Sequence, residues 1–74
     1  MPKLPRVSGK KISKILVKLG FEKFRQKGSH IFFVHKEGRV TTISVHGNKM
    51  IPIGTLKAIL KDIEISNDDF EKLV

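Results

Sequence analysis

The sequence contains no cysteine among its 74 residues. Disulfide bonds and metal sites built from thiolates are therefore excluded. Small domains that fold without disulfide bonds are typical of reducing compartments, so we expect the protein to be cytoplasmic. The N-terminal stretch MPKLPRVSGKK lacks the apolar segment of a secretory signal. No apolar run approaches the roughly 20 residues of a membrane-spanning helix, and we therefore expect no membrane partner.

Acidic residues are scarce as well, with 7 Asp and Glu against 15 Lys and Arg, which gives a formal net charge of +8. The few carboxylates are dispersed along the sequence and form no convergent set for magnesium, and no group of zinc ligands is apparent. The sequence therefore predicts no metal and no cofactor. The basic excess attracts polyanions, so a nucleic acid or an acidic protein is the predicted partner.

The length of the chain predicts a single domain over residues 1–74. A domain of this size buries only about 60% of its unfolded surface, and its core is thin. A functional site should therefore lie on an open face or in a shallow groove that a partner completes. Residues 1–7 contain two prolines and predict an extended segment that leads into the domain.

Apolar residues recur at helical spacing in two segments. The first predicts a helix over residues 8–19, with Ser8 as its N-cap and Gly20 as the residue that ends it. The second predicts a helix over residues 53–63 that begins after Pro52. Ser66, followed by acidic residues, predicts one or two further helical turns.

Three segments rich in aromatic and β-branched residues lie between these helices, at residues 21–26, 30–36 and 39–46. Turn residues separate them. The order α-β-β-β-α predicts an α+β fold, in which a three-stranded antiparallel sheet has the helices packed on one face.

The turn at Glu37–Gly38 decides which side chains share a face of the sheet. A three-residue loop with Gly38 in the left-handed position pairs His35 with Arg39. In this register His30 and Phe32 lie on the open face. His46 then lies on the same face, diagonal to His30.

A two-residue loop is the competing arrangement, and it pairs Lys36 with Arg39. This register turns His30 toward the core. We favour the three-residue loop, because Glu37 is poorly suited to the positive φ of a type I′ turn. In either register His35 faces away from His30, because an odd number of residues separates them, and we interpret His35 as structural.

His30 is the strongest candidate for a catalytic residue, because imidazole exchanges protons near neutral pH. RNA cleavage requires a base for the ribose 2′-OH, an acid for the leaving 5′-oxygen and a cation for the charged phosphorane. His46, Ser29 and Lys27 are candidates for assisting groups. The plain alternative is that His30 is an ordinary surface histidine of a strand.

Basic side chains on several segments are candidates for phosphate contacts, and Phe32 is a candidate for stacking on an unpaired base. The plain alternative for the lysines is that they form only the solvated face of a helix. The alternative for Phe32 is that a protein partner buries it. The candidate RNA-binding residues are Lys10, Lys11, Lys14, Arg25, Lys27, Phe32 and Lys49.

The stretches ISKILVKLGF, RQKGSHIFF, HKEGR, ISVHGNKMIPIGTLKAILKDIEIS and NDDFEKL together resemble the HicA family of toxin components over nearly the whole chain. The motifs that carry the resemblance are Gly28-Ser29-His30, the histidine at position 46 and the helix sequence GTLKAIL at 54–60. The resemblance implies a fold like that of double-stranded-RNA-binding domains. It also implies an mRNA interferase that arrests growth, a catalytic role for His30 and neutralisation by a HicB antitoxin.

Three functions remain open from the sequence. The leading one is the toxin of a type II toxin–antitoxin system, a metal-independent endoribonuclease that cleaves mRNA. The first alternative is a non-catalytic RNA-binding module of the same fold. The second is an interaction protein whose basic surface binds an acidic partner.

Overall fold

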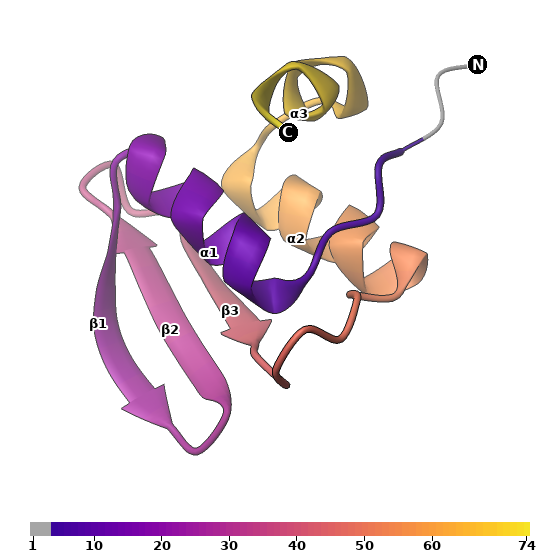
Figure 1. Cartoon of the computed structure of the whole chain (residues 1–74). Helices are drawn as coiled ribbons and strands as arrows, with labels where there is room; N and C mark the ends of the chain where they lie inside the picture. Colours follow the sequence, from indigo (N-terminus) through magenta and orange to yellow (C-terminus); the bar gives the residue numbers. More distant parts are fainter. Residues whose placement is uncertain (1–3) are drawn as a thin grey trace.

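The computed structural model describes residues 4–74, which form a helix, a three-stranded antiparallel sheet and two further helices (Figure 1). The elements are α1 (Gly9–Lys18), β1 (Phe21–Lys27), β2 (His30–His35), β3 (Val40–Ser44), α2 (Ile53–Ile63) and α3 (Asn67–Leu73). The predicted α+β fold and its α-β-β-β-α order are confirmed. Of the predicted N-terminal extension, residues 4–7 precede α1 without forming a helix or strand, and residues 1–3 lie outside the described part.

Hydroxyl caps begin the first and last helices, as the sequence predicts. The Ser8 hydroxyl accepts a hydrogen bond from the backbone N–H of Lys11 at 3.2 Å. The Ser66 hydroxyl accepts one from the backbone N–H of Asp69 at 3.1 Å. Gly20, with a φ of +96°, follows α1 in the left-handed conformation that ends helices.

Helix α2 begins after Pro52, as predicted, but it ends on a residue that the sequence does not mark. Glu64 adopts a left-handed conformation with φ of +58°, a region that glycine usually occupies. The N–H of Ile65 donates to the carbonyl of Leu60 at 3.1 Å, which is the bonding pattern of a Schellman motif. The motif seats the half-buried Ile65 against the core.

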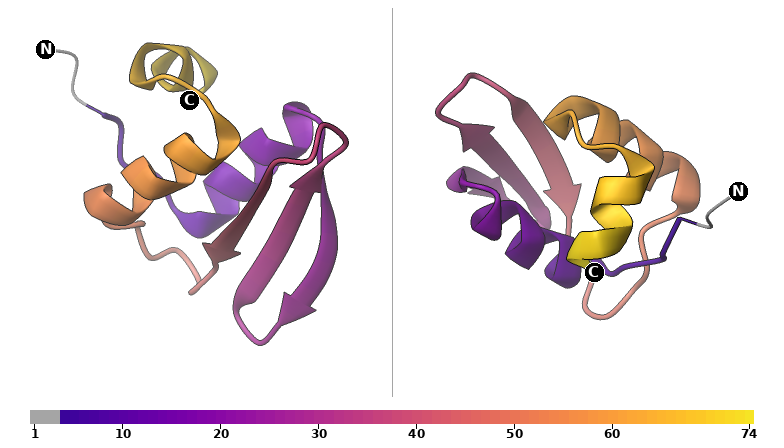
Figure 2. Two further views of the ribbon diagram at one scale, coloured as in Figure 1. Left: turned by 180° about the vertical axis from the view of Figure 1, so that it is seen from behind. Right: turned by 90° about the horizontal axis from the view of Figure 1, so that it is seen from above.

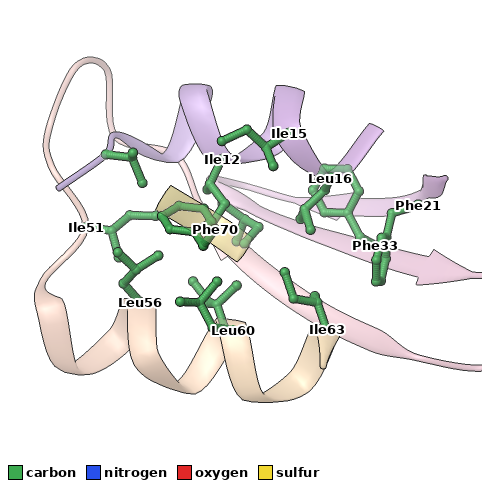
Figure 3. Packing of buried hydrophobic residues seen from close by; sticks show 13 residues of the cluster. Ile12, Ile15, Leu16, Phe21, Phe33, Ile51, Leu56, Leu60, Ile63 and Phe70 are labelled. Carbon is green, nitrogen blue, oxygen red and sulfur yellow. The ribbon is translucent and has the colours of Figure 1, made fainter. Parts of the chain in front are cut away.

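The core lies between one face of the sheet and the helices (Figure 3). Strand residues Phe21, Phe33 and Ile43 pack against Ile12 and Leu16 of α1. Helix α1 crosses this face and α2 lies alongside β3 (Figures 1 and 2). The remaining core residues come from the segments around the sheet and from α2 and α3: Val7, Ile15, Ile51, Leu56, Ile59, Leu60, Ile63 and Phe70. We call this side of the sheet the covered face and the other side the open face.

The β2–β3 hairpin has the three-residue loop. Gly38 has a φ of +96°, and the N–H of His35 donates to the carbonyl of Arg39 at 2.8 Å. Ile31 pairs with Ile43, which confirms the favoured register and excludes the two-residue loop.

Strand β3 is shorter than predicted, because it ends at Ser44 and not at His46. The N–H of Val45 donates to the carbonyl of Ser29 at 2.8 Å, and Ser29 already belongs to the β1–β2 loop. Beyond this point no strand residue remains opposite β3, so the chain leaves the sheet.

The β1–β2 hairpin is closed by a two-residue loop, because Lys27 pairs with His30. Gly28, at the first loop position, has a φ of +59° and Ser29 does not share this positive φ. This is the arrangement of a type II′ turn, whose twist matches that of the strands.

A β-bulge interrupts β1 at Phe24. Lys23 pairs with Phe33, whereas Arg25 pairs with Phe32, so Phe24 is an additional residue without a partner. Under strict alternation from the buried Phe21, every odd-numbered residue of β1 would face the core. The bulge shifts this alternation by one residue and brings Arg25 and Lys27 to the open face.

Candidate active site

Three polar side chains form a row across the open face at one end of the sheet. Lys27 of β1 pairs directly with His30 of β2, and His30 pairs directly with Ser44 of β3. Directly opposed residues share a face, with Cβ atoms about 4.5–5.5 Å apart. Lys27 and His30 are exposed and Ser44 is half-buried. A cation, an imidazole and a hydroxyl thus face solvent together.

Aromatic and basic residues form the next row. Arg25 pairs with Phe32, and Phe32 pairs with Thr42. The bulge places Phe24 beside them, where its ring centroid lies 6.1 Å from that of Phe32 at an interplanar angle of 56°. The Phe24 side chain is 59% exposed. This row lies two residues along the strands from His30, a step of about 6.8 Å.

His46 lies in the loop after β3 and not in a strand as predicted. It lines a hollow of 290 Å³ between β3 and α2, together with Ser44, Lys49 and other residues. The N–H of Lys49 donates to the carbonyl of His46 at 3.0 Å and holds the two residues in one turn. Ser44 therefore connects the two histidines, because it pairs with His30 across the sheet and lines the hollow together with His46.

Ser29, the remaining predicted assisting residue, is half-buried in the turn before His30. The contact that the structure gives it is through its backbone carbonyl, which accepts the N–H of Val45 at 2.8 Å. Ser29 therefore joins the two hairpins beside the row.

The structure does not bring the lysines of α1 together with His30. Helix α1 packs on the covered face through Ile12 and Leu16. Lys10, Lys11 and Lys14 are exposed on this helix, which the sheet separates from the row on the open face.

His35 occupies a structural environment. It is 6% exposed, and its ring packs edge-on against Phe21 with the centroids 5.0 Å apart. Its Nδ1 accepts the backbone N–H of Glu37 at 3.1 Å, and the guanidinium of Arg39 lies 3.4 Å from the ring nitrogens. The interpretation of His35 as structural is confirmed.

Sequence reasoning missed Phe24 as a surface residue of the site. The spacing of two aromatics within one strand is the signal for its exposure. Phe21 and Phe24 are three residues apart, so regular alternation places them on opposite faces of the sheet. The same alternation would leave Arg25 and Lys27 on the covered face. The sequence also gave no indication of the hollow, since Thr55 and Ile59 of α2 reach it from a distant segment.

Within residues 4–74, no three histidine or acidic side chains lie close enough together to hold a metal ion. None of the helices in this part of the chain has both the length and the apolar character needed to cross a bilayer.

These features define a class: a small, basic α+β domain with an imidazole and a cation side by side on the open face of its sheet. Residues 9–65 match the sequence model of the family described as HicA toxin of bacterial toxin-antitoxin. The chain therefore belongs to the HicA toxin family. Membership of a toxin–antitoxin family implies that its partner is an antitoxin. The match runs from the first residue of α1 to just beyond α2 and includes the whole polar row. No curated protein sequence matches the chain.

Proposed function

We propose that the protein is a metal-independent endoribonuclease of the cytoplasm, which cleaves mRNA and blocks translation as the toxin of a type II toxin–antitoxin system. One observation carries the proposal: Lys27 and His30 face solvent as a direct pair on the open face of a chain from a toxin family. A site on an open sheet suits a long polymer, which does not need to enter a cavity.

The row supplies the groups that transesterification of RNA requires. A base takes the proton of the ribose 2′-OH, and the 2′-oxygen forms a bond to phosphorus as the bond from phosphorus to the 5′-oxygen breaks. An acid then protonates the departing 5′-oxygen, which leaves a 2′,3′-cyclic phosphate and a 5′-hydroxyl. His30 and His46 share the two proton transfers, and the Lys27 ammonium stabilises the charge that develops on the phosphorane.

The surroundings of the row supply RNA binding. Arg25 and Lys49 contact the phosphates on either side, and Phe32 stacks on an unpaired base. Lys10, Lys11 and Lys14 act at a distance, because their charges add to the positive potential that draws RNA to the protein.

The antitoxin partner that we propose is HicB-like and covers the open face. The net charge of +8 favours an acidic partner, and the exposed Phe24 offers an apolar contact that such a partner would bury. Covering this face removes the row from RNA.

The test is incubation of the purified protein with single-stranded RNA in excess EDTA. The proposal predicts discrete products that end in 2′,3′-cyclic phosphate. Salt-sensitive RNA binding without any products would overturn it in favour of a non-catalytic RNA-binding module. Absence of RNA affinity at low salt would overturn it in favour of a protein that binds only an acidic partner.

A further inference from the structure

The hollow beside the polar row has a definite position in the fold. Its lining residues come from β3, from the loop that follows β3 and from the first turns of α2. Figure 1 shows where these three segments lie in the fold. Thr42 and Ser44 line it from the open face, and Thr55 and Ile59 line it from α2. Ser44 is the residue paired with His30, so the hollow begins one strand away from the imidazole, about 4.8 Å across the sheet.

The lining of the hollow combines an apolar surface with hydroxyl groups. Ile51, Pro52 and Ile59 supply apolar surface, whereas Thr42 and Thr55 supply hydroxyls that both donate and accept hydrogen bonds. A nucleobase has the matching chemistry, because its faces are apolar and its edge carries donors and acceptors. The volume of 290 Å³ is at the small end of ligand sites and suits one nucleoside.

Charge fixes the orientation of such a ligand. His46 and Lys49 line the hollow, and no carboxylate is among its lining residues in the described part of the chain. A second depression continues along the same groove, shares Thr42 and Thr55 with the first, and contains the carboxylate of Asp62. A phosphate is therefore favoured at the end of the groove next to His30 and disfavoured at the far end.

We propose that this hollow binds the base of one nucleotide adjacent to the phosphate that is cleaved, and that it thereby sets the sequence preference of cleavage. The proposal rests on the proposed function and names its substrate more closely, as an RNA strand with an unpaired base at that position. Lys49 holds the phosphate of the bound nucleotide, which leads the next phosphate, the one that is cleaved, across Ser44 to the two histidines and Lys27.

The first experiment compares the sites that three full-length proteins cleave in a random-sequence RNA pool: the unmodified protein, Thr55→Leu and Lys57→Leu. Thr55→Leu removes a hydroxyl from the hollow and fills part of it. Lys57→Leu introduces the same side chain on the exposed side of the same helix, outside the hollow, and is the matched control. We expect Thr55→Leu to change the relative use of bases at one position beside the cut by about tenfold, and Lys57→Leu to leave it unchanged. Identical preferences in all three proteins would overturn the proposal while leaving endoribonuclease activity established.

The second experiment does not depend on cleavage. Each of the four ribonucleoside 3′-monophosphates is titrated into ¹⁵N-labelled protein, and amide shifts are followed. We expect shifts concentrated in residues 42–55, with the best base saturating at about a tenfold lower concentration than the worst. Shifts there without RNA cleavage would overturn the proposed function and leave a nucleotide site. The inference itself would be overturned if saturating nucleotide caused no amide shift in residues 42–55. It would also be overturned if a peptide segment of the antitoxin bound in the hollow and nucleotides did not.

Discussion

Lys27 and His30 close the β1–β2 hairpin as a direct pair across a two-residue turn. A turn this short fixes the separation of their backbones, and the bulge at Phe24 fixes the face on which both side chains lie. Regular strand pairing therefore positions Lys27 and His30, whereas His46 is positioned by the loop that follows β3.

Replacing Lys27 with Ala should lower the rate of RNA cleavage about 10²–10³-fold, because it removes the cation beside the developing phosphorane charge. Lys23→Ala is the matched control. Lys23 lies on the same strand and is also exposed, but it pairs with Phe33 and faces the other side of the sheet. Cleavage rates of the two variants at equal salt concentration check this prediction, and equal losses would show that only net charge matters.

Replacing Phe24 or Phe32 with Ala should weaken binding of single-stranded RNA by about 1–3 kcal/mol, the usual contribution of one base stacked on an aromatic ring. Fluorescence anisotropy with the His30→Ala protein separates binding from cleavage. Val17→Ala, which removes an exposed apolar side chain of α1 on the other side of the sheet, serves as the control and should change affinity little. A loss as large for Val17→Ala would indicate a general apolar contact and not stacking.

The sequence was sufficient to predict the elements that depend on local patterns. Helical spacing and the caps at Ser8 and Ser66 predicted the helices, and Gly38 predicted the three-residue loop and the placement of His30 on the open face. Local chemistry determines each of these features.

Features that depend on long-range pairing were not predictable. The bulge at Phe24 reconciles two requirements of the β1–β2 pairing. Lys27 must pair with His30 beside the type II′ turn, and Phe21 at the other end of the strand must face the core. The early end of β3 depends on Ser29 of another hairpin, and the hollow depends on where α2 packs. No local pattern encodes these relationships.

Gly9→Ala should lower the free energy of unfolding by about 1–3 kcal/mol. A Cβ at position 9 would lie 2.5 Å from the backbone oxygen of Ser44, so α1 and β3 would have to move apart. Gly54→Ala, in α2, meets no atom within 4 Å and should instead stabilise the protein by about 0.5–1 kcal/mol. Urea unfolding of both variants checks the pair, and similar effects of the two changes would contradict the close approach of α1 to β3.

Glu64→Gly should raise the free energy of unfolding by about 0.5–1 kcal/mol. Glu64 ends α2 with a φ of +58°, a conformation that costs a residue with a Cβ about 1–2 kcal/mol. Glycine avoids this cost, but its greater freedom in the unfolded chain offsets part of the gain in stability. Thermal unfolding measures the change, and Lys61→Gly, in the last turn of the same helix, should destabilise by about 1 kcal/mol. A loss of stability in Glu64→Gly would mean that the side chain contributes more than its backbone costs.

The most direct test of the account is RNA cleavage by the His30→Ala protein. His30 is exposed, so its replacement should change the free energy of unfolding by no more than about 0.5 kcal/mol. We predict a protein with unchanged thermal unfolding that retains RNA binding, cleaves RNA at least about 10²-fold more slowly and no longer arrests growth when expressed without its antitoxin. A folded His30→Ala protein that cleaves RNA at the unmodified rate would contradict the central claim that this imidazole carries the reaction.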